Sequence, residues 1–249
     1  NFVQFLTEKF GEEITKKAVT NYKIGTSKKW VGSTVFWQVD KKYRIRTGKI
    51  MLYKGANRVK DCNSWVHSAM RLNDFVLSQC FFGEHLINNN TNDIAIVESE
   101  KTAILGSIYF PQFVWLASAG SGGINIDKLK ALDGRNVILF PDASIDGKMF
   151  KKWQDKTKSL DNVFVNDFLE INASPEEKET GTDLADYLLK YSLKDFQKQE
   201  VKFGERLVHY LALQVSMKIS SSNWKKYCSR LIYRRLWLMN CLKFLRTRK

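Results

Sequence analysis

The first third of the chain alternates between one helical pattern and two strand patterns. Residues 2–19 carry apolar side chains at steps of three and four, which predicts an amphipathic helix. Residues 21–32 are predicted to form a loop. Apolar residues in segments 35–39 and 45–53 predict two strands, with the turn of a hairpin at Asp40–Lys42. The sequence therefore predicts a β-rich N-terminal region.

The pattern changes after the polar run Asn88–Asp93, which reads as a linker. Short continuous apolar runs, typical of buried parallel strands, now alternate with amphipathic stretches that predict helices. The predicted strands cover residues 94–97, 113–117, 137–140 and 163–165, and the predicted helices cover residues 99–109, 126–132 and 148–160. Strands and helices that alternate over short connections predict an α/β domain with a parallel sheet. Further on, residues 174–182 are predicted to be polar and exposed, and residues 184–196 to be helical.

The positive charge of the chain is concentrated at its C-terminal end. The net charge is +14, but residues 215–249 hold ten Lys or Arg and no acidic residue, so the other residues carry only +4. Apolar residues among these cations predict a basic amphipathic helix from residue 222 onward. A basic excess of this size indicates a polyanionic partner, either nucleic acid or an anionic membrane surface.

The cysteines and the hydropathy indicate the cellular compartment. The chain has four cysteines and no C-x-x-C pair, so we expect no zinc site within it. Scattered cysteines suit reduced thiols, and the sequence shows neither a signal peptide nor a run of about 18 apolar residues. We therefore expect a cytoplasmic protein without a membrane span. The first residue is Asn rather than Met, as expected of a fragment or a processed product.

Three carboxylates follow predicted parallel strands and are candidate metal ligands. Glu98 closes the first strand, Asp142 closes the third, and Asp146 lies in the turn before the next helix. The carboxyl ends of neighbouring parallel strands meet at one edge of a sheet, which can bring Glu98 and Asp142 together. Mg²⁺ prefers such oxygen ligands, and Mn²⁺ is an alternative ion. The same residues are also common as solvated turn residues or helix caps.

Two segments resemble the motifs of toprim domains, the catalytic fold of bacterial primases and related nucleases. Residues 94–103 are similar to the first motif, in which a hydrophobic strand ends in a glutamate, here Glu98. Residues 137–147 are similar to the second motif, in which a strand ends in two aspartates one residue apart, followed by a glycine. Asp142 matches the first aspartate, but Ser144 stands at the position of the second, and Asp146 is a candidate to replace it.

Four further segments occur in the order found in primases, three of them similar to bacterial primases and the last similar to primase-like proteins of mobile elements. They are residues 46–51, 60–64, 81–85 and 181–189. The resemblance implies a toprim domain (an α/β, Rossmann-like, mostly parallel sheet) preceded by a smaller β-rich basic domain and followed by a basic helical tail. The implied boundaries are residues 1–90, 91–190 and 191–249. Primases of this type carry a zinc ribbon ahead of the basic domain, which here either lies upstream of Asn1 or never existed.

The resemblance also implies roles for individual residues. Glu98 and Asp142 would be catalytic and, with Asp146, would hold Mg²⁺. The residues expected to bind nucleic acid are Arg44, Arg46, Lys49, Lys60, Asn63 and Lys101. Each of these cations is alternatively an ordinary solvated surface residue.

The function implied is that of a DNA primase-like nucleotidyltransferase in the replication of a mobile element. Its expected partner is single-stranded DNA or another nucleic acid, and a replicative helicase or a relaxase is a candidate protein partner. Two alternatives stay open: a toprim nuclease, and an inactive toprim module that only binds nucleic acid. The second is favoured by Ser144 and by the missing zinc ribbon.

Overall fold

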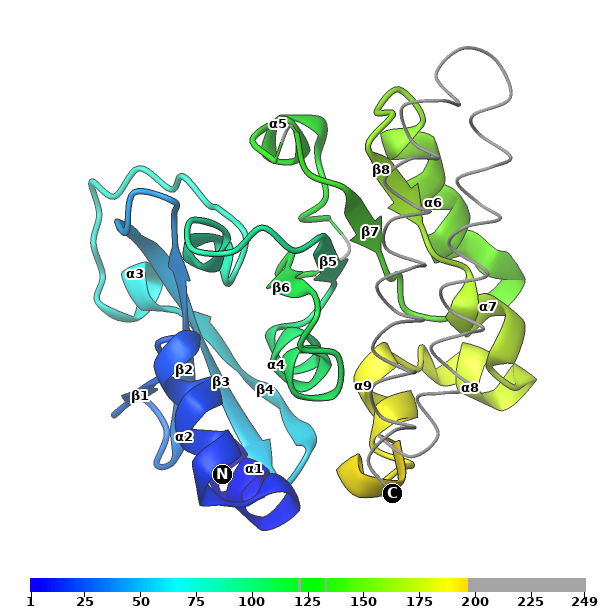
Figure 1. The fold of residues 1–249 in the computed structure, drawn as a ribbon. Helices are drawn as coiled ribbons and strands as arrows, with labels where there is room; N and C mark the ends of the chain where they lie inside the picture. Colours follow the sequence, from blue (N-terminus) through cyan, green and yellow to red (C-terminus); the bar gives the residue numbers. More distant parts are fainter. Residues whose placement is uncertain (121, 133, 197–249) are drawn as a thin grey trace, which may run out of the picture. The chain divides into compact units, whose positions relative to one another are not determined.

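The N-terminal region forms an antiparallel sheet with helices packed against it (Figure 1). The computed structural model describes residues 1–120, 122–132 and 134–196. The strands, in sheet order, are β1 (Gly25–Ser27), β2 (Ser33–Val39), β3 (Ile45–Lys54) and β4 (Asn57–Trp65). The predicted hairpin is confirmed, since Val35 pairs with Ile50 and the Tyr43 N–H donates to the Asp40 carbonyl in the turn. The short helix α3 (Val66–Ala69) and a 3₁₀ helix (Glu84–Ile87) follow.

The single helix predicted over residues 2–19 is wrong in one respect, because the structure divides it in two. Helices α1 (Phe2–Phe10) and α2 (Glu12–Asn21) meet at Gly11, whose φ of 84° is outside the helical region. A glycine adopts this left-handed conformation without a steric penalty, and there the first helix ends. The loop predicted over residues 21–32 also contains the short strand β1.

Aromatic side chains fill the core of the N-terminal region and join it to the rest of the fold. The Phe2 ring packs edge-on against Phe36, with centroids 5.6 Å apart. The Tyr22 ring stacks on Phe82 at 5.1 Å. The Tyr22 hydroxyl donates to the main-chain carbonyl of Trp115, at 3.0 Å, in the second sheet. These contacts hold the two sheets together through buried rings.

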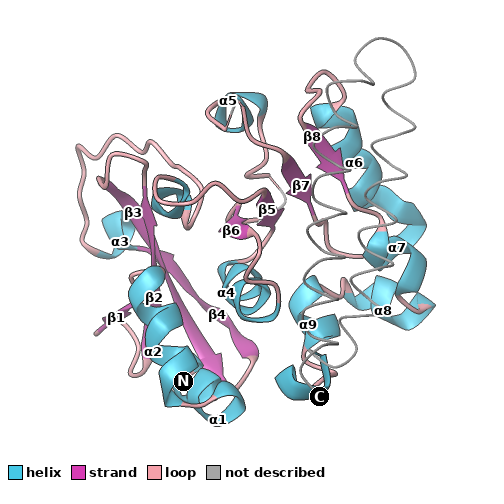
Figure 2. Ribbon diagram, viewed as in Figure 1, coloured by secondary structure: helices cyan, strands magenta, loops and turns pink. Residues whose placement is uncertain are grey.

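The second sheet is parallel throughout and has helices between its strands (Figure 2). In sheet order its strands are β6 (Val114–Ala117), β5 (Ile94–Val97), β7 (Val137–Leu139) and β8 (Val163–Val165). The helices are α4 (Glu100–Tyr109), α5 (Ile126–Lys130), α6 (Lys148–Thr157), α7 (Phe168–Asn172), α8 (Pro175–Thr180) and α9 (Leu184–Leu188), with a 3₁₀ helix at Ile145–Gly147. An antiparallel sheet followed by a parallel α/β sheet is the fold class that the sequence predicts.

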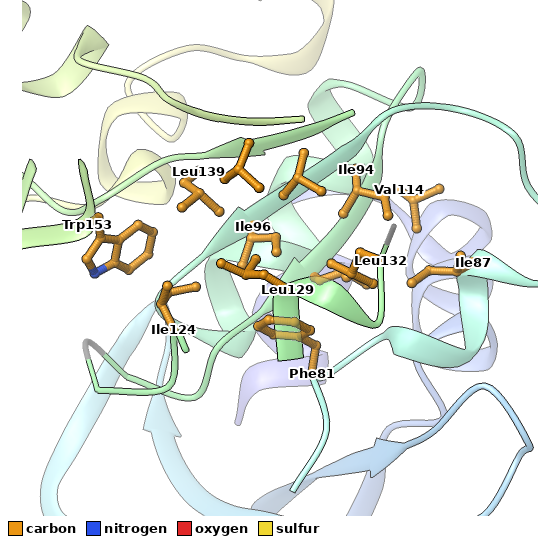
Figure 3. Packing of buried hydrophobic residues seen from close by; sticks show 13 residues of the cluster. Phe81, Ile87, Ile94, Ile96, Val114, Ile124, Leu129, Leu132, Leu139 and Trp153 are labelled. Atoms are coloured by element: carbon orange, nitrogen blue, oxygen red, sulfur yellow. The ribbon is translucent and has the colours of Figure 1, made fainter. Parts of the chain in front are cut away.

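Helices cover both faces of the parallel sheet. Alternate residues of a strand point to opposite faces, so Ile94 and Ile96 lie on one face. There they belong to a buried cluster with Leu129 of α5 and Trp153 of α6 (Figure 3). On the other face Trp115 packs against α4 so closely that a Cβ atom on Gly106 would lie 2.6 Å from the indole ring. Helices α4 and α6 therefore lie on opposite faces.

The region after β8 is more helical than predicted. The segment 174–182, predicted to be polar and exposed, contains α8, which begins with a capping box between Ser174 and Glu177. The helix predicted over residues 184–196 is interrupted, because α9 ends at Leu188 and the chain is helical again only at residues 193–196. The basic tail predicted from residue 222 lies outside the described residues.

In the part of the chain that the structure describes, no helix is both long enough and apolar enough to cross a membrane.

Candidate functional site

Glu98 and Asp142 lie at the carboxyl edge of the parallel sheet, after neighbouring strands. In the register of β5 and β7, Ile96 pairs with Leu139, so both strands end at the same level. The chain leaves β5 through α4 toward β6 on one side, and β7 lies on the other side of β5. The helices that follow β5 and β7 cover opposite faces of the sheet, and ligands of open α/β sheets bind at such a point. The topology therefore places both carboxylates where open α/β sheets bind their ligands.

The two carboxyl groups influence each other electrostatically. Burial raises the pKa of Asp142 well above its usual value, and the negative charges of Glu98 and Asp183 raise it further. Burial also raises the pKa of Glu98, although the cation Lys152 opposes the shift. The Glu98 Oε1 atom is buried and has no hydrogen-bond partner among the described residues. The cation Lys101 acts in the opposite direction and lowers the pKa of Asp142.

Asp183 is a third acidic group at this edge, for which the sequence predicted no role. It caps the N-terminus of α9, and its Oδ2 accepts a hydrogen bond from the Thr102 hydroxyl at 2.7 Å. The Lys101 amine lies 3.5 Å from the same carboxylate and 3.0 Å from the carboxylate of Asp186. The sequence signal was the spacing of Asp183 and Asp186, which forms a capping box and marks a helix start rather than a site.

The donor set fits a magnesium ion that keeps waters and substrate phosphates as its other ligands. Within residues 1–120, 122–132 and 134–196, no group of three or more His, Cys, Asp or Glu could hold a metal ion by itself. Mg²⁺ is usually held by one or two carboxylates, together with water and phosphate oxygens. Glu98 and Asp142 can supply those two carboxylates, and the unpartnered Glu98 oxygen is a free ligand atom.

The structure gives Ser144 and Asp146 positions in the turn between β7 and α6. The Ser144 hydroxyl accepts a hydrogen bond from the Met149 N–H at 2.8 Å, and its N–H donates to the Glu170 carboxylate at 3.0 Å. Ser144 thus shapes the turn. Asp146 is exposed, with a left-handed φ of 58°. Among the described residues, Asp146 does not form a metal-binding group of three with Glu98 and Asp142, so the structure does not bring it to the carboxylate pair.

Two of the predicted nucleic-acid-binding cations are held by one carboxylate. Asp40 lies in the turn between β2 and β3 and forms ion pairs with Arg44 at 2.8 Å and with Arg46 at 3.8 Å. Arg46 also donates through Nε to the Ser78 carbonyl at 2.9 Å. These pairings could not be predicted from the sequence, in which Asp40 has the features of an ordinary turn residue.

The other predicted binding residues divide into buried and exposed groups. Lys49 of β3 forms an ion pair with Glu100 of α4 at 3.4 Å, and Lys101 is occupied by Asp183 and Asp186. Burial alone would lower the pKa of Lys101, but these two carboxylates raise it. Lys60 and Asn63 lie on β4 with exposed side chains.

Comparisons with solved structures show similarity to primase catalytic domains at low sequence identity. The DnaG catalytic core is 15% identical, with a TM-score of 0.47, over 96% of this chain and 93% of that chain. The RNA polymerase domain of Mycobacterium tuberculosis primase DnaG is 13% identical, with a TM-score of 0.48, over 92% and 80%. A DnaG primase catalytic domain bound to single-stranded DNA is 14% identical, with a TM-score of 0.39, over 91% and 77%.

Comparisons of sequence give one assignment. No curated protein matches the chain. Residues 1–143 match the sequence profile of a family described as a domain of unknown function, DUF6371. That match spans more than half of the chain and includes Glu98 and Asp142, and the chain therefore belongs to the DUF6371 family.

Proposed function

We propose that this protein transfers nucleotidyl or phosphoryl groups on single-stranded nucleic acid, in the manner of a primase, with Mg²⁺ held by Glu98 and Asp142. The observation that carries the proposal is the position of these two carboxylates at the carboxyl ends of β5 and β7, which are neighbouring parallel strands. The charge of Glu98 raises the pKa of Asp142, so a divalent cation between them would stabilise both charged forms.

The chain's own groups supply position and charge around the ion. Bound Mg²⁺ would neutralise phosphate charge and activate an attacking oxygen. Asp183 fixes Lys101 beside the carboxylates and Thr102 fixes Asp183, so the cation of Lys101 is held in place before any substrate arrives. Lys152 on α6 provides a second positive charge close enough to affect Glu98. Fixed charges of this kind need no reorganisation during the reaction.

A polyanionic strand is the substrate class that the charge distribution favours. The net charge is +14, and Lys60 and Asn63 are exposed on β4. Arg44 and Arg46 are paired with Asp40, so phosphates would have to share these cations with that carboxylate. Contacts of this kind add sequence-independent affinity that falls as salt rises. The domain division at residues 90 and 190, the helicase or relaxase partner and the role in a mobile element remain predictions.

The first experiment measures Mn²⁺ binding by calorimetry in the presence of single-stranded DNA. We expect the parent protein to bind the ion, and Glu98→Gln and Asp142→Asn each to weaken binding at least tenfold. Asp155→Asn removes an exposed carboxylate from α6 and should leave binding unchanged. Asp146→Asn tests the remaining predicted ligand, and we expect no effect because Asp146 stands apart from the pair. Equal binding by the parent and both site variants would refute the metal site.

The second experiment separates the enzymatic alternatives. Primer synthesis on a single-stranded template with ribonucleotides would identify a primase, whereas cleavage of the template would identify a nuclease. Both activities should disappear in Glu98→Gln.

A protein that binds nucleic acid without catalysis is the second candidate, and Ser144 favours it. The residue at the position of the second aspartate is engaged in shaping a turn, with hydrogen bonds to Met149 and Glu170. This candidate predicts DNA binding that survives in Glu98→Gln, together with a parent protein that neither extends nor cleaves DNA at saturating Mn²⁺.

A further inference from the structure

A cavity of about 500 Å³ lies beside the carboxylate edge. One wall is formed by Trp65 at the end of β4 and by residues 77–79, and the other by the loop that follows β6 and by the start of α5. The volume falls within the range of roughly 300–1,000 Å³ typical of small-molecule sites. Nothing in the proposed metal chemistry uses this space.

Main-chain hydrogen bonds attach the cavity directly to the Glu98 segment. The Gly120 N–H donates to the Glu98 carbonyl at 3.0 Å, and the Ser118 N–H donates to the Val97 carbonyl at 2.9 Å. A ligand in the cavity would therefore lie next to the carboxyl end of β5.

The loop that forms the second wall has a constrained shape. A Cβ atom on Gly123 would lie 1.8 Å from the Ser118 carbonyl oxygen, so only glycine fits at this position. Ala119 has a φ of 65°, a left-handed conformation that residues other than glycine rarely adopt. Such backbone conformations persist only where the surrounding structure stabilises them, and they occur most often at ligand-binding and catalytic sites.

The first wall offers an aromatic surface that is supported from behind. The Trp65 ring stacks near His67, with centroids 6.2 Å apart, and His67 stacks on Phe75 at 4.9 Å. Leu77, which is 47% exposed, adds an apolar surface to the same wall. Aromatic rings held in this way are platforms on which nucleobases stack.

The polar groups of the cavity suit a neutral ligand better than a highly charged one. Gln79 offers an amide group, which can donate and accept hydrogen bonds as base edges do, and Asn125, whose Oδ1 caps α5, offers an amide donor. Among the described lining residues, the cation Lys128 is matched by the anion Asp127. A triphosphate would find little net positive charge here, whereas a base and its sugar require none.

We propose that this cavity binds the base and sugar of one nucleotide, stacked on Trp65, with the phosphate directed toward Glu98 and Asp142. The direction of the phosphate rests on the proposed function, but the stacking does not. The nucleotide has two sources, a free mononucleotide or one unit of a strand, and both present the same chemistry to the cavity.

The test measures binding of adenosine 5′-monophosphate to the full chain by calorimetry, in EDTA so that metal plays no part. We expect Trp65→Ala to weaken binding about 5- to 150-fold, the range for loss of one stacked base, and Trp65→Phe to retain most of it. Trp30→Ala is the matched control, because Trp30 lies between β1 and β2 and does not line the cavity. Gly122→Leu should weaken binding by placing a side chain in the cavity. It should not disturb the fold, because a Cβ atom at Gly122 has no other atom within 4 Å.

A parallel series with a short single-stranded oligonucleotide distinguishes the two sources. Loss of mononucleotide binding in Trp65→Ala supports a free nucleotide, and loss of oligonucleotide binding alone supports a unit of the strand. If Trp65→Ala and Gly122→Leu bind both ligands as tightly as the parent, the proposal is wrong. Because mononucleotide binding is measured in EDTA, it does not depend on the metal site, so failure of the metal site and failure of the cavity are seen separately.

Discussion

Replacement of Lys49 by methionine tests how the antiparallel sheet is held against α4. The Lys49 amine lies 3.4 Å from the Glu100 carboxylate, and their side chains are 15% and 1% exposed. The Glu100 Oε1 atom is buried without a hydrogen-bond partner among the described residues, so Lys49 is the counterion on which this carboxylate depends. The variant leaves that charge buried and unpaired.

The expected loss of stability follows from burial. Removal of one partner from a buried pair costs about 3–5 kcal/mol. Glu100 stands in the first turn of α4, where the helix dipole stabilises an anion by about 1 kcal/mol. We therefore expect Lys49→Met to lower the free energy of unfolding by about 2–4 kcal/mol. In a domain of this size that corresponds to a fall in Tm of roughly 4–16 °C.

Urea denaturation of a double-mutant cycle measures the coupling. Lys49→Met combined with Glu100→Gln removes both charges and should recover most of the loss, because the buried charge is gone. Lys190→Met is the control, since it breaks an exposed pair with Glu177 and should change the unfolding free energy by less than about 1 kcal/mol. The reasoning fails if Lys49→Met unfolds at the same urea concentration as Lys190→Met, or if the double variant shows the sum of the two single losses.

Three further predictions concern the backbone, the pH dependence and a loop. Gly123→Ala should lower Tm in a thermal scan by several degrees, because its Cβ would overlap the Ser118 carbonyl oxygen. Burial lowers the pKa of His85, so the native state disfavours the protonated imidazole; as pH drops below about 6.5 the unfolding free energy of the parent should fall relative to that of His85→Gln, and an unchanged difference between the two proteins at pH 7 and pH 5 would contradict this. Arg46→Met removes the hydrogen bonds to Ser78, so amide exchange in the segment around Ser78 should accelerate while exchange in the parallel sheet stays unchanged.

The strands of the parallel sheet were predictable because burial leaves a simple pattern. A strand covered on both faces must be apolar throughout, and residues 94–97 and 137–139 show this in the sequence itself. The position of Glu98 and Asp142 then follows from strand ends and parallel pairing. The break at Gly11 was missed because apolar spacing continues across it, whereas the change of chain direction depends on one φ angle.

The partners of charged residues were beyond sequence reasoning. Arg44 and Arg46 read as free cations, but both meet Asp40, a contact made by the folding of a hairpin. Asp183 joins the carboxylate edge from a helix far along the chain, and its local spacing signals only a cap. Ion pairs between residues far apart in the sequence produce no periodic pattern. Sequence patterns therefore predict the strands and helices of a site more readily than the charged residues that surround it.

The pairing of β5 with β7 makes the carboxylate site a product of association between two chain segments. Glu98 follows β5, and Asp142 follows β7, which comes after β6 and α5 in the sequence although it pairs directly with β5. A chain cut between β6 and β7 would give two fragments, one with Glu98 and the other with Asp142, and neither would contain the complete metal site. Metal binding would then depend on the concentration of the fragments, so in a split form of this protein metal binding would measure the association of the two fragments.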